Sequence, residues 1–136
     1  MDETITPGPS TTDHNVWVGL SYEDPLAARD WLRALGFRDG ILVEGEHGEV
    51  VHSEMVWPEG GRVMVSSRAR ADGTFVSAPG AATVYVVTDD VEAVHERAQR
   101  LGARVVRPLA TSDYGSSEFS VVDPEGNSFS FGTYAG

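Results

Sequence analysis

The segment Trp57-Pro58-Glu59-Gly60-Gly61 recurs in similar form 66 residues later, as Asp123-Pro124-Glu125-Gly126-Asn127. Pro-Glu-Gly stands at the same places in both, and proline and glycine are typical of a tight turn between strands. The same shift of 66 residues places Asp90 on Asp24 without a gap. Because several features recur in a single frame, the sequence indicates two copies of one structural unit.

Each copy contains one amphipathic helix. After Asp24 a proline opens a segment whose apolar residues recur at helical spacing as far as Gly36. This predicts a helix with Asp24 as its N-cap and a proline at its first position. In the second copy, Asp89 or Asp90 caps the equivalent helix, and Gly102 supplies the left-handed residue that ends it.

Runs of β-branched and aromatic residues surround both helices. They predict strands at 16–20, 37–44, 50–57 and 62–66 in the first copy, and at 83–87, 103–109, 117–122 and 128–134 in the second. We therefore expect an α+β fold of two tandem βαβββ modules, at about 15–67 and 82–134. They would form one domain over 14–136, after a flexible tail over 1–13 that lies outside the fold.

A βαβββ module buries only one face of its sheet, because its helix covers only one. Two modules side by side would make an incompletely closed, barrel-like sheet with a central cavity for a small molecule.

Composition excludes several classes of function. The chain has no cysteine, which removes disulfides and thiolate chemistry. Ten basic and 21 acidic residues give a net charge of −11, which repels nucleic acid and anionic membranes and suits a cationic ligand. No apolar run is long enough to span a bilayer, and residues 1–13 lack the features of a secretory signal. We expect a cytoplasmic protein.

The βαβββ order, the Leu-Gly helix exits at 35–36 and 101–102, and the turn at 123–127 resemble the glyoxalase/bleomycin-resistance/extradiol-dioxygenase superfamily, also called the vicinal oxygen chelate superfamily. The segments 51–55 and 61–65 are similar to its glyoxalase-like branch. This resemblance spans both copies. It implies a pocket for a small organic molecule between the modules, and a homodimer.

Metal-using members of that family take one ligand from the first strand and one from the last strand of each module. The resemblance places these positions at Trp17 and Met64 in the first module, and at Thr83 and Ser130 in the second. None of these side chains is an ordinary ligand for a divalent metal ion. We therefore expect no metal cofactor, and a pocket in which Trp17 and Met64 pack against an organic ligand.

Further residues are expected to line this pocket. They are Ser66, Tyr85, Arg107, Tyr114 and Ser128. Tyr114 lies in a loop that would close over the ligand, and the Arg107 guanidinium could pair with a ligand carboxylate. Phe129 and Phe131 alternate with serines, so the rings should pack on the helix and the serines face the cavity.

These features favour a metal-independent small-molecule-binding protein that sequesters a ligand or confers resistance. The alternative is a metal-dependent enzyme of the lyase or isomerase type. His52 and Glu54 are two residues apart on a strand and share a face, and the repeat places Glu118 at the position of His52 in the second copy. One imidazole and two carboxylates suit a divalent ion or an oriented base. A purely structural module, whose cavity is filled by side chains, is the third possibility.

Overall fold

A computed structural model describes residues 3–8, 14–68 and 80–136. The chain divides into two compact units, Met1–Pro79 and Gly80–Gly136. Each unit contains one helix and one open sheet in its described part, which confirms the α+β class and the two modules. In the part of the chain that the structure describes, no helix is both long and apolar enough to cross a membrane.

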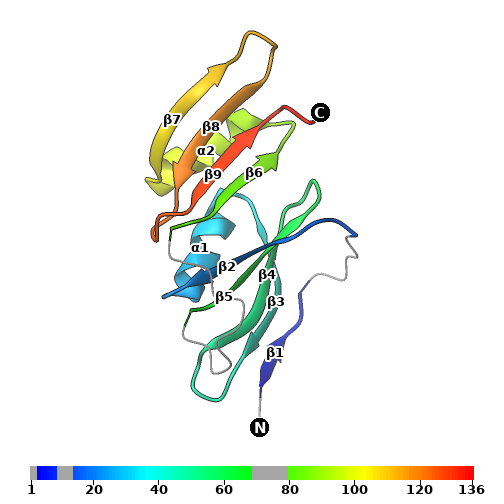
Figure 1. Cartoon of the computed structure of the whole chain (residues 1–136), viewed down its shortest axis with the longest axis vertical. Coiled ribbons are helices and arrows are strands. Elements are labelled where there is room, and N and C mark those ends of the chain that lie inside the picture. Colours follow the sequence, from blue (N-terminus) through cyan, green and yellow to red (C-terminus); the bar gives the residue numbers. More distant parts are fainter. Residues whose placement is uncertain (1–2, 9–13, 69–79) are drawn as a thin grey trace. The chain divides into compact units, whose positions relative to one another are not determined.

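The first unit is a mixed five-stranded sheet with one helix (Figure 1). Its elements are β1 (Thr4–Thr6), β2 (Val18–Tyr22), α1 (Pro25–Leu35), β3 (Arg38–Glu44), β4 (Val50–Val56) and β5 (Arg62–Ser67). The strand order is β1-β3-β4-β5-β2, and β2 runs parallel to β5 while the other pairs are antiparallel. Helix α1 packs against this sheet.

The second unit repeats this plan with four strands (Figure 1). Its elements are β6 (Thr83–Val87), α2 (Val91–Leu101), β7 (Arg104–Thr111), β8 (Ser117–Val122) and β9 (Ser128–Gly132). The order is β6-β9-β8-β7, and β6 runs parallel to β9. Helix α2 packs on strands β8 and β9.

The repeat read from the sequence is confirmed at atomic detail. Both helices have eleven residues and begin and end at positions 66 apart. The carboxylate of Asp24 accepts a hydrogen bond from the Ala27 N–H at 3.1 Å, and Asp90 accepts one from Ala93 at the same distance. The strand register follows the same shift, since Val18 pairs with Val63 and Val84 with Phe129.

Residues Thr4–Thr6 differ from our expectation. We placed 1–13 outside the fold, whereas β1 forms an antiparallel edge strand on β3, with Ile5 opposite Val43 (Figure 1). Two β-branched threonines flank an isoleucine in this segment, a composition that favours extended backbone. Its partner β3 would otherwise present an unpaired strand edge. Residues 1–2 and 9–13 lie outside the described part of the chain.

Strand alternation separates two faces of each sheet. In the second unit Phe129 and Phe131 are fully buried on the side of α2, as expected, and the intervening serines point to the other side. In the first unit Val63 and Val65 are buried in the same way. We call the side opposite the helix the helix-free face of each unit.

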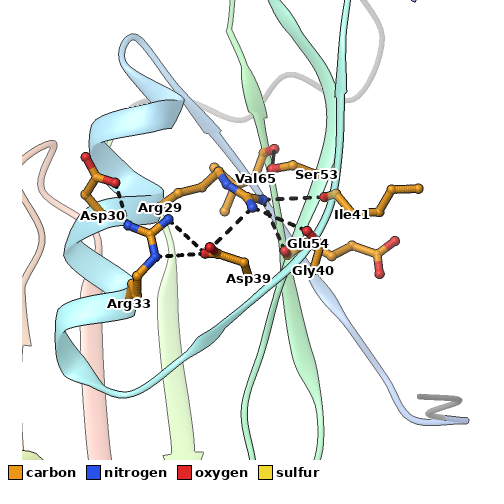
Figure 2. Close-up of polar contacts among 9 residues, drawn as sticks. All are labelled: Arg29, Asp30, Arg33, Asp39, Gly40, Ile41, Ser53, Glu54 and Val65. Carbon is orange, nitrogen blue, oxygen red and sulfur yellow. Dashed lines mark hydrogen bonds and ion pairs between the residues drawn. The ribbon is translucent and has the colours of Figure 1, made fainter. Parts of the chain in front are cut away.

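A buried arginine joins α1 to the sheet. Arg29 is only 4% exposed, and its guanidinium donates to the carbonyls of Gly40 at 3.3 Å and Glu54 at 3.2 Å (Figure 2). It also donates to the carbonyl of Ile41 and lies 3.8 Å from Asp39. Burial lowers the pKa of Arg29, while the Asp39 charge opposes this effect.

The carbonyls that Arg29 binds lie at a bulge. The pairing of β3 with β4 shifts between Asp39 and Leu42, so this short stretch cannot complete its ladder with β4 alone. The guanidinium therefore supplies donors that the sheet lacks at this point. Gly40 allows the close approach, since a Cβ placed there would lie 2.6 Å from the carbonyl oxygen of Glu54.

We predict that Gly40→Ala destabilises the protein by about 1–3 kcal/mol, because the added methyl overpacks against backbone rather than a flexible side chain. Gly19→Ala is the matched control. A Cβ at Gly19 would meet only the Met64 methyl carbon at 3.6 Å, which is an ordinary contact. Urea unfolding followed by circular dichroism measures both, and equal midpoints would show that the bulge tolerates a side chain.

Candidate functional site

The helix-free face of the first unit brings together three of the expected pocket residues. Met64 lies between Gly19 on β2 and Glu54 on β4, its register partners. Trp17 immediately precedes β2, and its ring lies under the guanidinium of Arg62, 4.7 Å from the ring centroid. Ser66 follows Met64 by two residues on β5 and so shares its face.

A line of polar contacts crosses this face. Glu54 accepts from the Arg62 guanidinium at 2.8 Å through one carboxylate oxygen, while its other oxygen lies 2.7 Å from His52 Nε2. The Arg62 and Glu54 side chains are only 8% and 13% exposed, so this ion pair is largely withdrawn from water. His52 is more open at 41%. We call Trp17, Arg62, Glu54 and His52 the Trp–Arg–Glu–His cluster.

The cluster sets the charge state of Glu54. Burial by itself raises the pKa of this carboxyl, but hydrogen bonds from His52 and Arg62 and their charges outweigh burial, so the pKa of Glu54 is lowered. Glu54 is therefore ionised at neutral pH. A carboxylate held in this way can orient an imidazole or a bound ligand's donor group.

The helix-free face of the second unit is rich in hydroxyl groups. Thr83 pairs with Ser128 and Tyr85 with Ser130 across parallel strands, which places all four on one face. The Ser130 hydroxyl lies 2.6 Å from that of Ser120. A hydroxyl group can donate a hydrogen bond to an organic ligand and can also accept one from it.

Two charged side chains complete this second face. The Arg107 guanidinium lies 3.1 Å from the Glu118 carboxylate, and the arginine is the more exposed partner. Tyr114 stands in the loop between β7 and β8, where its ring packs edge-on against Tyr134 at 6.0 Å.

The structure thus groups the expected residues within each unit. Trp17 and Met64 share one face, and Thr83 and Ser130 share the corresponding face of the second unit. His52 contacts Glu54 in the first unit, whereas Glu118 belongs to the second. Among the described residues, no three His, Asp or Glu side chains gather in a manner suited to a metal ion.

Arg62, Ser120 and Tyr134 also touch expected residues, although they were not themselves predicted. Strand alternation offered a signal for Arg62, which lies two residues before Met64 and so on the same face. Tyr134 had no such signal, because it follows the last strand and reaches Tyr114 only through the fold.

The fold and this site can be compared with known proteins. The family model described as Glyoxalase/Bleomycin resistance protein/Dioxygenase superfamily matches residues 4–131. The crystal structure of TioX from Micromonospora sp. ML1 is 31% identical, with a TM-score of 0.73, and the match covers 88% of this chain and 98% of that one. No curated protein matches the chain.

Two more distant structures are similar in fold alone. A glyoxalase/bleomycin resistance protein from Streptomyces sp. CB03234 is 20% identical, with a TM-score of 0.69 over 86% of this chain and 97% of that one. A protein from the mobile metagenome of V. Pseudocholerae is 17% identical, with a TM-score of 0.66 over 94% and 99%.

We predict that Glu54→Gln destabilises the protein at pH 7 by about 1–3 kcal/mol, because it leaves Arg62 with a weaker partner. Since the folded-state pKa of Glu54 is lowered, its contribution is present above the unfolded-state pKa and is lost as pH falls through the folded-state value. The difference between wild type and variant should therefore shrink from about pH 5 downward. Unfolding free energies measured across this range test this, with exposed Glu96→Gln as the control. A difference independent of pH would contradict it.

Proposed function

Since this chain belongs to the Glyoxalase/Bleomycin resistance protein/Dioxygenase superfamily, we propose that it binds a small organic molecule on the helix-free faces of its sheets, without a metal ion, and acts by sequestering that molecule. The observation that carries this proposal is the chemistry at the family's ligand positions. By the resemblance, these positions are Trp17 and Met64 in the first unit, and Thr83 and Ser130 in the second. Indole, thioether and hydroxyl groups suit an organic molecule better than a divalent ion.

The carboxylate beside Met64 does not supply the missing metal ligand. Glu54 pairs with Met64 across the sheet, but its two oxygens are engaged by Arg62 and His52. A metal ion would have to displace a guanidinium from a largely buried ion pair, which is costly. The same pair keeps the Arg62 guanidinium over the Trp17 ring, 4.7 Å from its centroid, and the half-buried indole can contact an organic ligand.

Resistance is the biological setting we favour, and it rests on resemblance to the family rather than on a contact. A protein of this type needs affinity for a molecule and no nucleophile. We also infer a homodimer, because an open sheet in each unit leaves strand edges that pairing would protect.

One contact favours an enzyme as the second candidate. The 2.7 Å approach of His52 Nε2 to Glu54 resembles a base held in position by a carboxylate, and His52 is open enough to meet a substrate. In such an enzyme His52 would transfer the proton, so its removal would abolish the activity.

We predict that the purified protein contains no stoichiometric divalent metal and that EDTA leaves its melting temperature unchanged. His52→Ala should leave both the metal content and the binding of an organic ligand nearly unaltered. Elemental analysis and thermal unfolding, with and without EDTA, measure the first part. A screen of organic molecules measures the second, because a ligand at a hundred times its Kd stabilises the folded state by about 2.7 kcal/mol.

A metal ion at unit stoichiometry, lost on His52→Ala together with tenfold or greater loss of activity, would instead establish the enzyme. A melting temperature that no member of the screen raises would count against binding altogether. Arg62→Met tests the cluster independently: it removes the cation above Trp17 and should weaken any ligand that stacks there.

A further inference from the structure

The tyrosines of this chain are unevenly placed. Of its four, Tyr22 is buried in the first unit, and the other three lie together in the second. The Tyr85 hydroxyl donates to the carbonyl of Tyr134 at 2.9 Å, and the rings of Tyr114 and Tyr134 meet edge-to-face at 6.0 Å. We call Tyr85, Tyr114 and Tyr134 the tyrosine patch.

The tyrosine patch is exposed although its parts are fixed. Tyr85, Tyr114 and Tyr134 are 43%, 72% and 55% exposed. Large aromatic rings held on a surface by hydrogen bonds and ring contacts are typical of recognition sites, since they present much area and lose little entropy on binding. Tyr85 belongs to the helix-free face, so the patch continues the surface proposed to bind the ligand.

A glycine makes room for this arrangement. A Cβ at Gly132 would lie 2.6 Å from the Tyr85 hydroxyl and 3.0 Å from the Cβ of Glu118. Tyr85 and Glu118 therefore meet above Gly132, where any larger residue would push the phenol away from Tyr134. Burial and the nearby Glu118 charge raise the pKa of Tyr85, which keeps its hydroxyl protonated and donating at neutral pH.

The charges around the patch favour a cationic partner. Glu118 stands beside Tyr85, and exposed Asp113 is the chain neighbour of Tyr114. The carboxylate of Glu118 already binds a planar cation, the guanidinium of Arg107, at 3.1 Å. Because the Arg107 side chain is 64% exposed, this ion pair is weak and a ligand cation could replace it at little cost. The faces of tyrosine rings also attract cations.

We propose that the tyrosine patch and Glu118 recognise a planar aromatic cation, whose ring stacks on Tyr85 or Tyr114 and whose charge replaces Arg107 at Glu118. This inference rests on the proposed function and specifies the ligand's chemical class. It assigns Tyr134 and Gly132 as well, which fix the positions of the two rings.

Three probes of nearly equal shape test the charge: N-methylquinolinium, neutral quinoline, and quinoline-4-carboxylate. Each is titrated at neutral pH into the full-length ¹⁵N-labelled protein and followed by amide chemical shifts. We expect the cation to bind at least about threefold more tightly than quinoline and the anion to bind least, in keeping with a cation–aromatic contact at an exposed site. The shifts should centre on Tyr85, Gly132 and Glu118.

Variants then locate the binding. Tyr85→Leu and Tyr114→Leu should each weaken N-methylquinolinium by about threefold or more. Glu118→Gln should reduce the preference for the cation, because the carboxylate's share is lost while the tyrosine rings remain, whereas Glu96→Gln, which removes the same charge on an exposed turn of α2, should leave the preference unchanged. Gly132→Ala retains all three tyrosines but displaces Tyr85, and should weaken the cation as Tyr85→Leu does. The fingerprint amide spectrum of each variant shows whether it is folded.

The proposal is overturned if no probe binds at millimolar concentration, or if quinoline binds as tightly as its cation. Tightest binding by the carboxylate, lost on Arg107→Gln, would overturn it in favour of an anion site at Arg107. If the organic screen finds a ligand whose affinity is the same in wild type and in all the patch variants, the proposed function stands and this inference fails. If the organic screen finds no ligand, but N-methylquinolinium binds and the patch variants weaken it, this inference stands and the proposed sequestering function fails.

Discussion

One eleven-residue helix lies on each sheet of this protein, and a helix can cover only one face of a sheet. The rest of the structure follows from that limit. Strand residues alternate between the two faces, so a strand under the helix buries every second residue, as β9 does with Phe129 and Phe131. The positions between them are released from the core and are free to carry Met64, Ser130 and the polar residues that could meet a ligand.

The two copies share backbone and register but have diverged in chemistry. Under the shift of 66, Arg29 corresponds to His95 and Ser53 to Phe119. In the first copy the buried guanidinium satisfies carbonyls at the β3 bulge, whereas in the second the His95 ring packs edge-on against Phe119 at 5.0 Å. A bulge also interrupts the pairing of β7 with β8 near Val105. Both copies therefore have a bulge in the equivalent strand pair, while the equivalent helix position holds a buried arginine in one copy and a histidine packed on an aromatic ring in the other.

The helix-free faces have diverged too. In the first unit Glu54 and Arg62 form a partly buried ion pair beside Trp17, while the equivalent positions of the second unit are Ser120 and Ser128. One face thus offers charge and a fixed indole, and the other offers hydroxyls bordered by tyrosines.

The sequence by itself determined the helix and four strands of each copy, their order and their faces, because turn residues, caps and hydrophobic period are local properties that act within a few residues. It located the limits of the first helix at Asp24 and Gly36. Tertiary structure alone decided which side chains meet. The bond of Arg29 to Gly40, the use of both Glu54 oxygens, the meeting of Tyr85 with Tyr134 and the addition of β1 to β3 all join residues distant in the chain. Such contacts depend on strand register, bulges and the space left by single glycines, and no local pattern encodes these.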